Sequence, residues 1–95
     1  MTLTEFKESI KASKPPEKVG TLLTALWHDA KGNWEAAHNL AQDVHNIDGS
    51  WIHAYLHRKE GDAGNASYWY HRANQPISTK SLQEEWEDIA RALLR

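Results

Sequence analysis

The stretch WIHAYLHRKEGDAGNASYWYHRA, from Trp51 to Ala73, decides the fold of this chain. Its two amphipathic halves flank a Gly61-Asp62 turn, in which the aspartate can cap the helix that follows. The stretch holds three of the six histidines, and its run Tyr68-Trp69-Tyr70 contains three of the eight tyrosine and tryptophan residues. We therefore expect a helical hairpin in which the chemically active side chains are concentrated.

The composition is that of one small globular domain over residues 1–95. Hydrophobic residues make up 40% and charged residues 25%, and the net charge of −2 comes without a basic stripe, so nucleic acid is not an expected partner. The lack of cysteine excludes disulfides and thiolate metal ligands. No apolar run has the length of a signal-peptide core or a membrane span, which predicts no membrane partner and a cytoplasmic location.

Hydrophobic periodicity predicts an all-α fold of about six short helices. Turn sequences separate four inner helices, expected at about residues 16–31, 34–45, 51–59 and 62–73. A capping box opens each of the two flanking helices. Thr2 and Glu5 form the first, at the start of a helix over residues 2–13, and Ser81 and Glu84 form the second, for a helix over residues 80–94. The solvent-exposed face of the last helix is expected to carry Glu84, Glu85, Glu87 and Asp88.

The inner helices show an internal repeat. Turns fall on turns and core positions on core positions when the chain is shifted by 29 residues, as two copies of one helix-turn-helix unit require. The units are residues 19–47 and 48–75. Identities at this offset include Ala25 with Ala54, His28 with His57, Gly32 with Gly61 and Ala37 with Ala66.

The second unit resembles the tetratricopeptide-like helical repeats. The residues that carry the resemblance are the Gly61-Asp62 turn, Ala66 four positions after the aspartate, the aromatic run 68–70 and the closing Ala73. The period of 29 is shorter than the ~34 residues of the common form, so the groove shape of that family does not transfer. The resemblance covers residues 19–75 and implies two stacked units, with the flanking helices as caps.

The repeat favours a binding protein over an enzyme, with a peptide or small ligand held in a groove lined by the first helix of each unit. Histidines on the polar face of those helices would provide titratable donors in this groove. Tyr68 and Arg72 are four residues apart and are expected to stack or hydrogen-bond. The predicted ligand-binding residues are His28, His53, His57, Arg58, Tyr68 and Arg72.

A metal site is the alternative. His53 and His57 share one face of a predicted helix, opposite its apolar stripe, so we expect both to be exposed. Together with Glu60 and His71 they supply the residue types of a hydrolytic zinc site, although the order His-Glu-x-x-His is absent. This alternative predicts a minimal metal- or histidine-dependent hydrolase with zinc as its cofactor.

Self-association is a third interpretation, because five tryptophans are many for so short a chain. An exposed Trp34 or Trp86 on an apolar patch would mark a homodimer face. His38 and His45 are expected at the edge of the buried stripe of the third helix, packed against Trp34.

Overall fold

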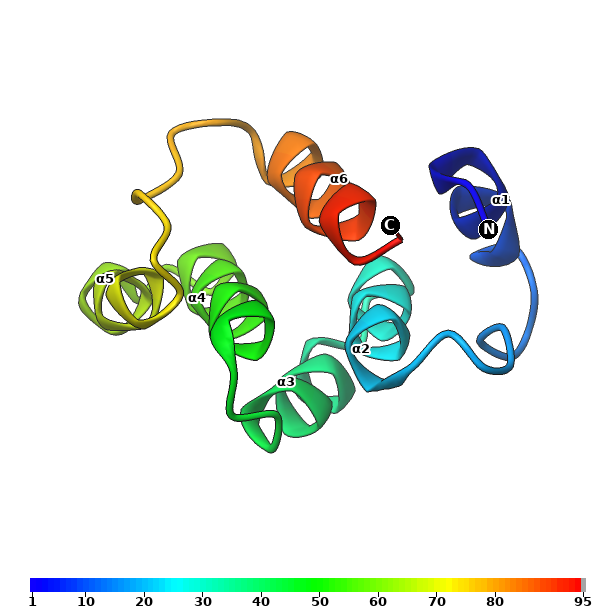
Figure 1. The fold of residues 1–95 in the computed structure, drawn as a ribbon, viewed down its shortest axis with the longest axis horizontal. Helices are drawn as coiled ribbons and strands as arrows, with labels where there is room; N and C mark the ends of the chain where they lie inside the picture. The colour runs from blue at the N-terminus through cyan, green and yellow to red at the C-terminus, as the bar shows by residue number, and fades with distance from the viewer. Residues whose placement is uncertain (95) are drawn as a thin grey trace.

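The computed structural model describes residues 1–94, and Figure 1 shows the helices of this part of the chain. They are α1 Leu3–Ser9, α2 Thr21–Ala30, α3 Trp34–Gln42, α4 Ile47–Lys59, α5 Ala63–Arg72 and α6 Leu82–Leu93. No strand occurs within residues 1–94, so the all-α prediction is confirmed. None of the described helices is both long and apolar enough to cross a bilayer.

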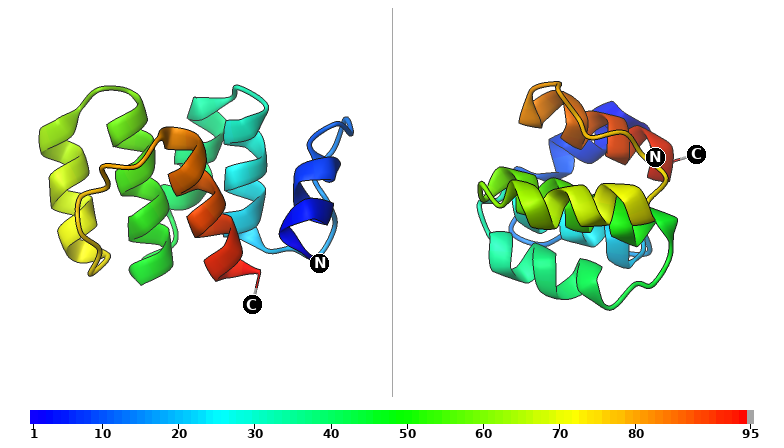
Figure 2. Two further views of the ribbon diagram at one scale, coloured as in Figure 1. Left: turned by 90° about the horizontal axis from the view of Figure 1, so that it is seen from above. Right: turned by 90° about the vertical axis from the view of Figure 1, so that its left-hand side faces the viewer.

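Two helical hairpins form the body of the molecule. Figure 2 shows α2 and α3 beside α4 and α5, with α6 lying against the first helix of each pair and α1 against α6. The core fills the space between these elements, and its large side chains include Phe6, Leu26, Trp27, Ile52, Tyr55, Leu56, Trp86 and Ile89. That the hairpins are copies of a tetratricopeptide-like unit stays a prediction.

The two hairpin turns have the same local structure. Gly32 and Gly61 adopt φ angles of 84° and 88°, which favour glycine because a side chain would be strained there. The amide of the following residue, Asn33 or Asp62, donates to the carbonyl five positions earlier at 2.9 Å. The side chains of Asn33 and Asp62 then cap α3 and α5, as predicted.

The start of α4 was predicted too late, because the helix begins at Ile47 and not at Trp51. The side chain of Asn46 accepts the amide of Gly49 at 2.7 Å and so caps the helix. The segment between residues 45 and 51 was expected to be a turn, because its residue types favour turns. The same types also favour helix N-termini, and most of this segment forms the first turn of α4. Correspondingly, α3 ends at Gln42, before its predicted end.

The start of α2, by contrast, was predicted too early. Pro16 does not open the helix, which begins at Thr21. Lys18 and Gly20 adopt φ angles of 63° and 90°, and these left-handed conformations are incompatible with a continuous helix.

Contacts with α2 explain why α1 ends at Ser9, short of its predicted length. The indole N–H of Trp27 donates to the Ser9 carbonyl at 3.1 Å. The ammonium of Lys31 donates to the carbonyls of Ile10 and Ala12 at 2.8 and 3.0 Å. These side chains satisfy the carbonyls that a longer helix would have used internally.

One residue expected on the solvent-exposed face of α6 is buried. Glu85 is only 2% exposed. Its carboxylate accepts the Tyr70 hydroxyl at 2.7 and 2.8 Å, the Arg58 guanidinium at 2.9 Å and the Trp51 indole at 3.2 Å. Burial and this carboxylate raise the pKa of Tyr70. Arg58 also donates to the Lys80 carbonyl, so the network ties α6 and the segment before it to α4 and α5.

We expect Gly49→Ala to lower the free energy of unfolding by about 2 kcal/mol. A Cβ at this buried position would lie 2.1 Å from the Val44 carbonyl oxygen, so the backbone must shift. Urea denaturation measures the loss. Gly64→Ala is the matched control, because nothing lies within 4 Å of its Cβ position in α5, and a gain of about 0.5 kcal/mol is expected there. Equal effects at both glycines would contradict the close approach.

We expect Glu85→Ala to cost about 3 kcal/mol or more, because Arg58 and Tyr70 lose the carboxylate that pairs them. Chemical denaturation followed by circular dichroism measures the loss. Glu35→Ala removes an exposed carboxylate from the first turn of α3 and should change stability by no more than about 0.5 kcal/mol. A similar small cost at both positions would show that the network does not hold the helices together.

Candidate functional site

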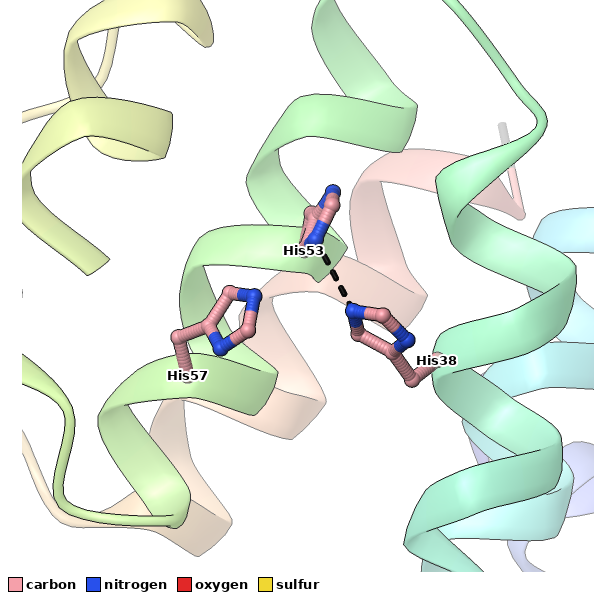
Figure 3. Close-up of side chains that lie close together, drawn as sticks. All are labelled: His38, His53 and His57. Carbon is pink, nitrogen blue, oxygen red and sulfur yellow. Dashed lines mark hydrogen bonds between the residues drawn. The ribbon is translucent and has the colours of Figure 1, made fainter. Parts of the chain in front are cut away.

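Three histidines from two helices converge in the interior, as Figure 3 shows. His38 comes from α3, and His53 and His57 come from successive turns of α4. The Nε2 atoms of His38 and His53 lie 3.0 Å apart, and one ligand nitrogen from each ring lies within 4.8 Å of the other two. These residues are called the three-histidine cluster here.

The expectation that His53 and His57 would be exposed is wrong, because each is only 7% exposed. Aromatic side chains from both neighbouring helices cover them. His53 stacks on Trp69 of α5, with ring centroids 4.0 Å apart and an interplanar angle of 17°. Trp34 of α3 packs edge-on against His57 at 6.0 Å and stacks on His38 at 4.8 Å, which confirms the predicted His38–Trp34 packing.

The surroundings favour uncharged imidazoles. Burial, together with the nearby His38 and His57, lowers the pKa of His53 to about 4. Burial and His57 also lower the pKa of His38, although Glu60 opposes this shift. Two rings of the cluster are therefore neutral near pH 7, and each keeps one nitrogen lone pair available.

Glu60 fixes the orientation of the third ring. Its carboxylate lies 2.5 Å from Nδ1 of His57, so that Nδ1–H donates to the carboxylate and Nε2 takes no part in this contact. The sequence analysis also grouped Glu60 with His53 and His57, but it assigned Glu60 as a metal ligand and not as the hydrogen-bond partner of His57. A second converging group consists of His57, Glu60 and Asp62, in which both carboxylates are exposed.

The structure does not bring the other predicted histidines into the cluster. His28 lies on α2 and packs edge-on against Trp27 at 5.2 Å. His71 is exposed on α5. Within the described residues, neither belongs to a group of converging ligand atoms, so His71 does not join His53, His57 and Glu60 as the metal hypothesis required.

The remaining candidates have two different environments. Arg58 is committed to Glu85 and to the segment before α6. Tyr68 and Arg72 form the predicted pair on the surface of α5, with the guanidinium 3.3 Å from the hydroxyl and 5.7 Å from the ring centroid. Arg72 also lies 5.6 Å from the centroid of Trp69.

A pocket of about 630 Å³ adjoins the cluster. It lies between the end of α3, the start of α4 and the second half of α5, and no carboxylate lines it among the described residues. His45, which was expected to pack against Trp34, is exposed and lines this pocket instead. The aromatic and basic lining residues are His45, His53, Tyr68, Trp69, His71 and Arg72.

Trp34 and Trp86 do not form the exposed surface that would mark a homodimer. Trp86 is buried, and its indole donates to the Leu26 carbonyl at 3.0 Å. Trp34 is half-buried against the cluster and donates to the Leu56 carbonyl at 2.8 Å.

Sequence reasoning missed the role of His38 and the position of the pocket. The position of His38 at the edge of the buried stripe of α3 indicates only that it packs against Trp34. Nothing in the periodicity of α3 indicates which side chains of α4 it meets. The contact of His38 with His53 joins residues 15 positions apart and depends on how the helices pack.

In the metal-free protein, the free energy of unfolding should fall as the pH is lowered from about 6.5 to about 4. His53 binds a proton with its ordinary pKa of 6.5 when unfolded but only near pH 4 when folded, so acid favours the unfolded state in this window. The difference corresponds to about 3 kcal/mol. The titratable groups that act on His53 are His38 and His57, and Trp69 covers the ring from α5.

Urea denaturation in the presence of a chelator, repeated across this pH range, measures the effect. His53→Gln should remove most of the pH dependence, whereas His71→Gln, at an exposed position, should retain it. An unchanged pH dependence in His53→Gln would show that burial does not depress the pKa of this histidine.

Comparisons with known proteins do not identify the chain. No protein-family model matches it, and neither a curated protein nor a solved structure is significantly similar to it. Its function must therefore be inferred from the geometry of the pocket and the three-histidine cluster.

Proposed function

We propose that the chain is a small helical binding protein whose pocket beside α5 accepts an acidic peptide segment of a partner protein. The observation that carries the proposal is the charge of the pocket lining. Arg72 is the one permanently charged side chain in this lining, and no carboxylate lines it among the described residues, although the chain as a whole has a net charge of −2. Such a lining attracts carboxylates and repels cationic segments.

Arg72 is available for a ligand. Its guanidinium is exposed and lies over the rings of Tyr68 and Trp69, and it forms no ion pair among the described residues. The hydrogen bond to the Tyr68 hydroxyl uses one of its five N–H groups. A peptide carboxylate could therefore bind the guanidinium in a bidentate manner without breaking a buried interaction.

The same pocket offers apolar surface. Ile47 and Tyr68 line it and are 49% and 54% exposed, which makes them two of the four large hydrophobic residues exposed among those described. A volume of about 630 Å³ falls in the range of ligand pockets, ~300–1,000 Å³. The pocket therefore suits a segment that contains both acidic and aliphatic residues.

The resemblance to helical repeats supports a binding role, because such proteins present one surface of stacked hairpins to a partner. Of the six predicted ligand-binding residues, His53, Tyr68 and Arg72 line this pocket, and the proposal rests on these three. The hydrolase alternative has less support, because it needs His71 beside His53 and His57.

Selection from a random peptide display library tests the proposal without assuming a partner. Peptides enriched on the wild-type chain in the presence of a chelator should be rich in aspartate and glutamate. Arg72→Gln should bind the best of them about tenfold more weakly in fluorescence anisotropy, because a charge-assisted hydrogen bond is lost. The affinity should also fall with added salt.

Arg91→Gln is the matched control, since Arg91 belongs to α6 and lines no part of the pocket. This variant should bind like the wild type. Enrichment of basic or purely apolar peptides, or equal affinities for wild type and Arg72→Gln, would overturn the proposal.

A further inference from the structure

We propose that His38, His53 and His57 form a site for one divalent transition-metal ion of the zinc type. This inference does not depend on the peptide pocket. It concerns a different set of atoms, the converging ring nitrogens in the interior, and the pocket shares only His53 with them.

The geometry of the cluster is close to that of a coordinated ion. Zinc binds imidazole nitrogen at ~2.0–2.1 Å, so two nitrogens on a tetrahedral ion are about 3.3 Å apart. The Nε2 atoms of His38 and His53 are 3.0 Å apart, and the three ligand nitrogens all lie within 4.8 Å of one another. Figure 3 shows the rings turned toward a common centre, so small rotations about the side-chain bonds would complete the site.

The rings are in the correct chemical form for this role. A metal ion needs an unprotonated nitrogen, and burial keeps His38 and His53 neutral near pH 7. In the metal-free state the Nε2–H group of one ring donates a hydrogen bond to Nε2 of the other. When the ion binds, that proton moves to Nδ1 of the same ring, so both Nε2 lone pairs become ligands and no net proton is released from the pair.

Outer contacts hold the rings in place. Glu60 accepts Nδ1–H of His57 at 2.5 Å, which is the carboxylate-histidine contact that orients many metal ligands. Trp34 stacks on His38, and Trp69 stacks on His53. Three protein ligands leave one coordination position for water or another ligand, as in catalytic and not structural zinc sites.

This assignment changes the metal set predicted from the sequence. His38 takes the place of His71, and Glu60 becomes a positioning residue for His57. The competing group of His57, Glu60 and Asp62 is a weaker candidate, because Asp62 already caps α5 through the Asn65 amide and Glu60 already binds His57.

The test uses the full chain without a histidine tag, stripped of metal with a chelator. Calorimetric titration with Zn²⁺ at neutral pH should give one ion per chain, and Co²⁺ should develop the strong visible absorption of four-coordinate cobalt. His38→Gln and His53→Gln should each weaken Zn²⁺ binding by about a hundredfold or more. Glu60→Gln should weaken it by about 10- to 100-fold, as for other carboxylates that orient metal ligands.

Two control variants separate this site from its competitors. His71→Gln removes an exposed histidine, and Asp62→Asn removes a carboxylate but keeps a good helix cap. Both should bind Zn²⁺ like the wild type. Loss of binding in Asp62→Asn would assign the ion to the competing group and would overturn the proposal, as would unchanged binding in His38→Gln or the absence of one-to-one binding in the wild type.

Imidazole ¹⁵N spectra of the wild-type chain provide a readout that needs no variant and is therefore unaffected by any loss of folding. Addition of one equivalent of Zn²⁺ should shift the ring signals of His38, His53 and His57 and leave those of His28 and His71 in place. Shifts confined to the exposed histidines would overturn the proposal.

Discussion

The pairing of the Glu85 carboxylate is the interaction on which the helix arrangement depends. A buried charge is tolerated only when donors surround it, and here Trp51 and Arg58 of α4 and Tyr70 of α5 supply them to a residue of α6. Three helices therefore meet at one carboxylate. A second buried carboxylate, Asp29, ties α2 to α4 in the same way. These contacts hold α4 against α2, α5 and α6, and α3 also packs on it.

Local signals in the sequence were reliable. The capping boxes, the Gly-Asn and Gly-Asp turns and the Tyr68–Arg72 pair involve residues within five positions of one another, and the structure contains all of them. The start of α4 was wrong because one residue type can serve two local structures. Asn46 is as suitable for a turn as for a helix cap, and in the structure its side chain caps α4 while Gly49 lies close to Val44.

The site was harder to predict, because helical periodicity describes a helix with one buried face. On such a helix, His53 and His57 lie on the face opposite Tyr55 and would be exposed to solvent. In α4 that opposite face is covered by Trp34 and Trp69 from the flanking helices, so the polar positions are buried too. Glu85 was misjudged for the same reason. Contacts between helices decide these cases, and a single sequence does not encode them in its spacing.

His53 belongs to both the three-histidine cluster and the wall of the pocket. Two ligands that share one side chain cannot bind independently, because each changes the position or protonation of a group that the other contacts. Thermodynamic reciprocity then requires that an ion in the cluster alter the affinity of the pocket by the same factor by which a pocket ligand alters the affinity for the ion. Through this one imidazole, the proposed metal site and the proposed peptide pocket would be linked.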